Sequence, residues 1–183
     1  MSSRLLWLLL LWAALAGCVN REREAALKRL HGPAAKERAE AARALGKMAR
    51  PGDDEIWVEL ERATRDPAPL VRIACAEAML SAPKPTGAVA DERGAVADDA
   101  VAALLSDLDE SVQTAAAVAL GKRCGERPVA YLQGAFNRSG ASARAAISES
   151  LIACGVTPAQ LFKRAEEIRR LRAVDWLSST SSA

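Results

Sequence analysis

The chain has 183 residues, with 25 basic and 23 acidic side chains, and half of its residues are hydrophobic but only 4% are aromatic. Its alanine-rich composition, poor in β-branched and aromatic residues, excludes a β-sandwich or barrel and argues against an α/β enzyme. The length suits one domain or a short array of small units, and the net charge of +2 argues against a nucleic-acid partner.

The amino-terminal segment has the pattern of an export signal. A basic start at residues 1–4 precedes an unbroken apolar run at residues 5–16. As a helix this run rises about 18 Å, which is short of the hydrocarbon core of about 30 Å. The run therefore predicts a signal peptide over residues 1–17 rather than a membrane span.

The end of this run, Leu15, Ala16, Gly17 and Cys18, resembles the lipobox of bacterial lipoproteins. The resemblance implies cleavage before Cys18, a diacylglycerol thioether on its sulfur and an acyl chain on the new amino terminus. Two or three acyl chains anchor a protein stably. Residue 19 is Val rather than Asp, so the inner-membrane retention signal of enteric bacteria is absent, and in a diderm organism the implied address is the outer membrane, facing the periplasm. The alternative is an ordinary secretory signal with an incidental cysteine.

A self-similar, alanine-rich segment recurs through the rest of the chain, and its copies align on Arg38, Arg72, Gln113 and Arg144. Residues 66–72 and the helix ends at residues 42–46 and 117–121 resemble HEAT repeats of the bacterial phycobilisome-lyase type. The resemblance covers about residues 21–177. It implies an all-α fold, a short α-solenoid of about four HEAT-like helical hairpins plus a C-terminal capping helix, in one domain spanning residues 18–177.

Each hairpin pairs a first helix with one of the aligned segments. The first helices are expected at residues 21–30, 54–64, 98–106 and 128–136, and the capping helix at residues 158–177. A stretch rich in Pro, Gly and Asp predicts a loop insertion at about residues 82–98. Asp98 is a candidate cap for the helix that follows this loop. Residues 178–183 are expected to form a disordered tail.

The aligned segments show two faces at helical spacing. The face expected to form the core consists of Ala41, Ala42, Leu45, Cys75, Ala76, Met79, Ala116, Ala117, Leu120, Ile147, Ser148 and Leu151. The opposite face is expected to line a concave surface that could bind another protein, through Glu40, Arg43, Lys47, Glu77, Val118, Lys122 and Glu149. A merely solvated face is the alternative. Similarity to other HEAT arrays implies that the aligned arginines form a turn-stabilising ladder with Asp66 and Asp107.

The sequence holds no recognisable catalytic set. His31 is its only histidine, which argues against the His-rich sites of zinc or di-iron enzymes and against a Ser/His or Cys/His catalytic set. No glycine-rich phosphate loop is present. We therefore expect no enzyme, no metal and no cofactor, apart from the covalent diacylglycerol and N-acyl chain on Cys18.

Of the remaining cysteines, Cys75 falls on the core face, whereas Cys124 and Cys154 lie near the ends of adjacent second helices. Stacked helices are about 8–10 Å apart, which exceeds the usual Cα separation of a disulfide. Two buried free thiols are therefore expected. A disulfide, which an oxidising envelope would permit, requires distortion at the helix ends.

These features predict a lipid-anchored, non-enzymatic scaffold that binds one or more proteins of the cell envelope, with no nucleic-acid partner. One alternative is a structural spacer that stacks on further copies of itself. The charged residues of the last expected helix disfavour this alternative, because they are typical of a polar cap. The other alternative is a protein related to the chromophore lyases, which the missing catalytic set disfavours.

Overall fold

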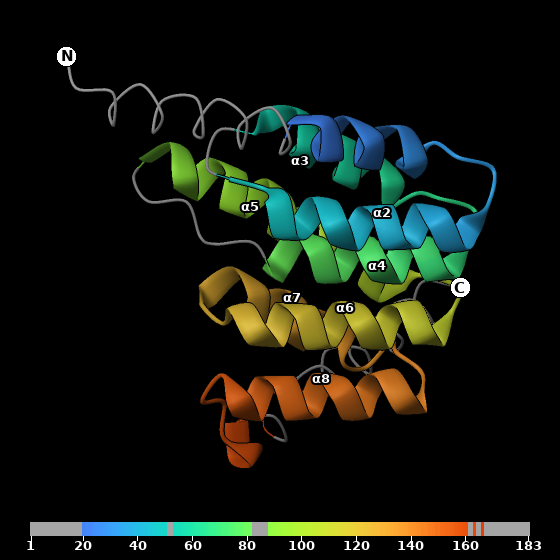
Figure 1. Ribbon diagram of the computed structural model, residues 1–183. Coiled ribbons are helices and arrows are strands. Elements are labelled where there is room, and N and C mark those ends of the chain that lie inside the picture. Colours follow the sequence, from blue (N-terminus) through green and yellow to red (C-terminus); the bar gives the residue numbers. More distant parts are fainter. Residues whose placement is uncertain (1–19, 51–52, 82–87, 161–162, 164–165, 167–183) are drawn as a thin grey trace, which may run out of the picture. The chain divides into compact units, whose positions relative to one another are not determined.

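A computed structural model describes residues 20–50, 53–81, 88–160, 163 and 166 (Figure 1). Within these residues all regular secondary structure is helical, which confirms the predicted all-α class. The expected signal peptide, Cys18, the start of the expected loop and the C-terminal tail lie outside the described residues, as does most of the capping helix beyond residue 160. None of the described helices is both long enough and apolar enough to cross a bilayer.

The first of two compact units extends from Met1 to Val101. Its helices are residues 20–30, α2 (Ala35–Met48), α3 (Asp54–Ala63), α4 (Pro69–Ser81) and most of α5 (Ala88–Ala103). The most extensive packing joins α2 to α4, which Figure 1 shows side by side, and α3 lies against both. The second helices of the first two hairpins therefore stack on each other.

The second unit extends from Ala102 to Ala183. It contains the 3₁₀ turn η1 (Leu104–Ser106), α6 (Glu110–Arg123), α7 (Glu126–Ala135) and α8 (Ala141–Ala153), followed by a helical turn at residues 158–160. α6 and α8 pack along each other, and α7 contacts both. This arrangement repeats that of α2 and α4, and it is compatible with a short helical solenoid.

The expected loop is wrong over most of its length. α5 begins at Ala88, so residues 88–97 are helical, and Asp98 is a buried residue within the helix rather than its cap. The physical reason is composition: from Ala88 onward the segment is rich in alanine and contains no proline. Its single glycine, Gly94, weakens a helix without ending it.

The expected core face is confirmed with one exception. All of its residues are buried except Ser148, which is half-buried. Small residues let the second helices approach closely. A Cβ added at Gly46 of α2 would lie 2.6 Å from the Cβ of Ala78 on α4. A Cβ added at Gly121 of α6 would lie 2.5 Å from that of Ser150 on α8.

Candidate functional site

The four aligned residues stabilise the turns between paired helices. Each side chain donates to backbone carbonyl oxygens in the turn that precedes its own helix. The nitrogen–oxygen distances are 2.6–3.1 Å: Arg38 to Gly32 and Pro33, Arg72 to Asp66 and Pro67, Gln113 to Asp107, and Arg144 to Ser139. The repeated arginine therefore satisfies polar groups of the backbone that the end of a helix leaves unpaired.

The expected ladder is confirmed for one pair. Nε and Nη2 of Arg38 donate to the two carboxylate oxygens of Asp66, each at 2.8 Å, and both side chains are largely buried. The Ala68 amide donates to the same carboxylate at 2.8 Å. Burial raises the pKa of Asp66, but the bonds from Arg38 and Ala68 outweigh it and hold this pKa below its usual value. The hydrogen bond to Asp66 in turn raises the pKa of Arg38.

The residues of the expected binding face lie on the surface within each unit. In the first unit Glu40, Lys47 and Glu77 are exposed, and Arg43 is half-buried. The structure brings two of them into contact, because Nε of Arg43 lies 2.8 Å from Oε2 of Glu77 and so bridges α2 and α4.

The members of this face in the second unit follow the same pattern. Val118 and Lys122 are exposed on α6, and Glu149 is exposed on α8. Val118 is the apolar member, with 41% of its surface open to solvent.

The expectation of free thiols at Cys124 and Cys154 is wrong, because the two form a disulfide with a Cα–Cα distance of 5.3 Å. Each cysteine follows the last residue of its helix, and the Cys124 backbone turns away with a φ of 47°. Gly121 of α6 also packs directly against Ser150 of α8, so the two helices approach closely one turn before the disulfide.

Cys75 is the free cysteine of the described residues, and it is fully buried in α4. Burial raises the pKa of its thiol to about 12. The thiolate is the nucleophilic form of cysteine, so this side chain acts as a small hydrophobe and not as a reactive group at neutral pH. Among the described side chains, no group of three His, Cys, Asp or Glu residues is placed to hold a metal ion.

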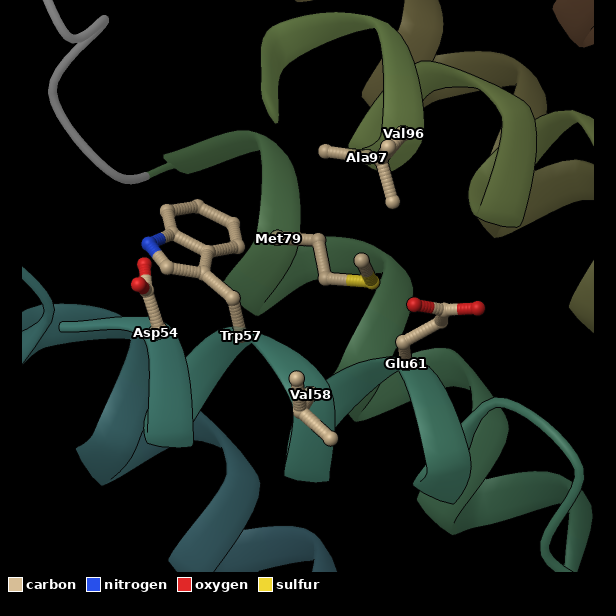
Figure 2. Close-up of a pocket in the computed structure, with 7 residues that line it drawn as sticks. All are labelled: Asp54, Trp57, Val58, Glu61, Met79, Val96 and Ala97. Atoms are coloured by element: carbon tan, nitrogen blue, oxygen red, sulfur yellow. The ribbon is translucent and has the colours of Figure 1, made fainter. Parts of the chain in front are cut away.

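A groove that the sequence reasoning missed lies in the first unit, between α3, α4 and α5. It encloses about 340 Å³. Figure 2 shows the residues that line it: Asp54, Trp57, Val58 and Glu61 of α3, Met79 of α4, and Val96 and Ala97 of α5. The available signal was the spacing of the four α3 residues, which places them on one helical face, separate from the face that buries Ile56 and Leu60.

The structure defines an all-helical protein in which paired helices stack within each unit and an apolar groove opens beside the second pair. No protein-family model matches the chain, and no curated protein matches its sequence. Its function is therefore inferred from its own residues.

Proposed function

We propose that this protein is a lipid-anchored, non-enzymatic interaction module of the bacterial cell envelope, and that its helical array binds another protein at the same membrane. The observation that carries the binding role is the groove between α3, α4 and α5. It offers about 340 Å³ of largely apolar space open to a ligand, lined by a half-buried tryptophan. Sites of this kind, apolar with a few polar groups at their edge, are typical of binding.

Two further features support the envelope address. The Leu15–Cys18 tetrapeptide matches the lipobox pattern, and the Cys124–Cys154 disulfide is of a kind that persists in oxidising compartments. This proposal implies no cofactor apart from the acyl chains on Cys18. The same tether would limit the array to partners close to the bilayer, because few residues separate Cys18 from the helix at residues 20–30.

Crosslinking in the native cells tests this proposal, with the full-length protein compared to its Cys18→Ser variant. Metabolic labelling with a fatty-acid analogue checks the anchor in the same samples. We expect the wild type to carry the label and to crosslink reproducibly to one envelope protein. We expect the variant to lose the label and most of the crosslink.

Two results would count against the proposal. If the wild-type protein takes up no fatty acid, the proposed lipid anchor is wrong. If the wild-type protein is labelled but crosslinks to no protein in repeated experiments, the proposed interaction role is wrong.

A further inference from the structure

The outer face of α3 carries an ordered pattern. Asp54, Trp57, Val58 and Glu61 are spaced by three, one and three residues, so that they form one stripe with a carboxylate at each end and apolar side chains between them. Two helical turns separate the end residues, which is a rise of about 10 Å. Figure 2 shows Asp54 beside the indole of Trp57 at one end of the groove and Glu61 at the other.

The middle of the groove is apolar and open. Met79 and Ala97 are buried within it, whereas Val58 and Val96 expose 52% and 50% of their surfaces. Single exposed apolar residues are common, but here those of two helices line the same cavity. A ligand that covers them would remove apolar surface from water on both walls.

The charge on the groove is negative in a protein whose net charge is close to zero. Of the residues that line the groove, Asp54 and Glu61 are acidic and none is basic, whereas the neighbouring Glu55 and Glu59 form ion pairs with Arg23 and Arg62. The Glu61 carboxylate forms no hydrogen bond or ion pair within the part of the chain that the structure describes. An acidic rim of this kind repels phosphate-bearing lipids and nucleic acids and attracts cations.

We propose that the groove binds a basic amphipathic helix of the partner protein. Its apolar side chains would lie over Met79 and against Trp57, and two lysine or arginine residues would face Asp54 and Glu61. Two residues seven apart on the bound helix are separated by the same axial rise as Asp54 and Glu61. Their charges can therefore face the two carboxylates whichever way the bound helix runs. The indole face of Trp57 also attracts a cationic side chain. This inference rests on the proposed function and names the chemistry of the partner.

The test is a binding titration of the full-length protein in detergent micelles. The probe is a fluorescein-labelled, alanine-based helical peptide with lysines at positions i and i+7 and leucines at i+3 and i+4. Fluorescence anisotropy reports binding, at low and at high salt. A second peptide with both lysines replaced by glutamates is the charge control, and one with both leucines replaced by serines is the apolar control. We expect the first peptide alone to bind, and more weakly at high salt.

Substitutions in α3 test whether the peptide binds in the groove. Glu61→Gln should weaken binding about three- to fivefold, the factor for one exposed ion pair, and Val58→Asn should weaken it by a similar factor. The matched control is Glu55→Gln, which makes the same charge change on the same helix but at a residue that contacts Arg23 outside the groove. It should change the affinity by less than about twofold. Helix content and melting temperature establish that each variant is folded.

The inference fails if the lysine peptide does not bind, if the glutamate peptide binds equally well, or if Glu61→Gln and Glu55→Gln have equal effects. It also fails if the serine peptide binds as well, or if spermidine competes as strongly as the unlabelled lysine peptide, because the site would then be one for small polyamines. The proposed function is judged separately. A cellular crosslink that persists in the Glu61→Gln and Val58→Asn variants would overturn the groove as the docking site and leave the interaction role standing.

Discussion

The Arg38–Asp66 pair joins the second helix of one hairpin to the turn of the next. Arg38 reaches from α2 into its own preceding turn and also to Asp66, which lies between α3 and α4. Asp66 in turn accepts the amide of Ala68, two residues further along. One guanidinium and one carboxylate thus fix the relation of two neighbouring hairpins in the first unit, through charge-assisted bonds in a partly dehydrated site.

This pair predicts a pH dependence of stability. The pKa of Asp66 is lower in the folded protein than in the unfolded chain, where it is about 3.9. Its stabilising effect is therefore complete above about pH 4 and is lost as the pH falls through the lower, folded pKa. Asp66→Asn should reduce the free energy of unfolding at pH 7 by about 2 kcal/mol. Urea titrations at several pH values measure both effects.

The matched control is Glu40→Gln, which neutralises an exposed carboxylate on α2. It should leave the stability at pH 7 within about 0.5 kcal/mol of the wild type. If Asp66→Asn loses stability on acidification as steeply as the wild type does, Asp66 is not a source of the acid sensitivity.

At the level of the helices, the second helices of each unit approach each other closely because the residues at their contact are small. Gly46 lies against Ala78, and Gly121 lies against Ser150, whose hydroxyl donates to the Ala117 carbonyl oxygen at 3.0 Å. The second helices of each unit therefore contact through backbone and small side chains.

Two glycines of the chain should respond to the same substitution in opposite directions. Gly46→Ala places a methyl group against Ala78 and should reduce the free energy of unfolding by about 2 kcal/mol. Gly134 on α7 has open space around it, so Gly134→Ala should stabilise by about 0.5–1 kcal/mol through helix propensity alone. Chemical denaturation of both variants provides the comparison. Equal effects would show that α2 and α4 are not in close contact at Gly46.

Some of the helices are easier to predict from the sequence than others. The second helices are predictable because alanine and leucine recur on one face at helical spacing, and the structure buries nearly all of them. The start of α5 is not, because the two prolines and the glycine before Ala88 predict a loop that extends too far. The groove was missed for a different reason: the acidic and apolar stripe on α3 makes sense only when α4 and α5 are placed beside it.

Within the whole molecule, the disulfide acts on only one of the two units. Cys124 and Cys154 are separated by 30 residues, and the segment between them contains α7 and α8 of the second unit. A crosslink of this length stabilises mainly by restricting the unfolded chain. The sequence alone could not establish it, because the average spacing of packed helices is too wide and the local approach at Gly121 is a property of the folded pair.

Reduction of this disulfide should lower the stability of the second unit by about 3–4 kcal/mol. Hydrogen exchange followed by mass spectrometry should then show faster exchange in α7 and α8, with little change in α2 and α4, because contacts in helical arrays are local. A Cys124→Ser/Cys154→Ser variant provides the control, as reductant should not change its exchange. Equal acceleration in α2 and α4 would contradict the local effect.

Gln113 has a consequence for how such an array tolerates change. It occupies the place that arginine takes in the other three copies, and it still donates to the carbonyl oxygen of its own turn at 2.6 Å. At this turn a long side chain that ends in an N–H group makes the bond without a positive charge. At position 113, exchange of glutamine for arginine or lysine should therefore be nearly neutral, whereas Arg38 also forms the ion pair with Asp66 and should not tolerate the same exchange. Glutamate or leucine at position 113 should be destabilising and therefore selected against, because neither side chain can donate to the carbonyl group.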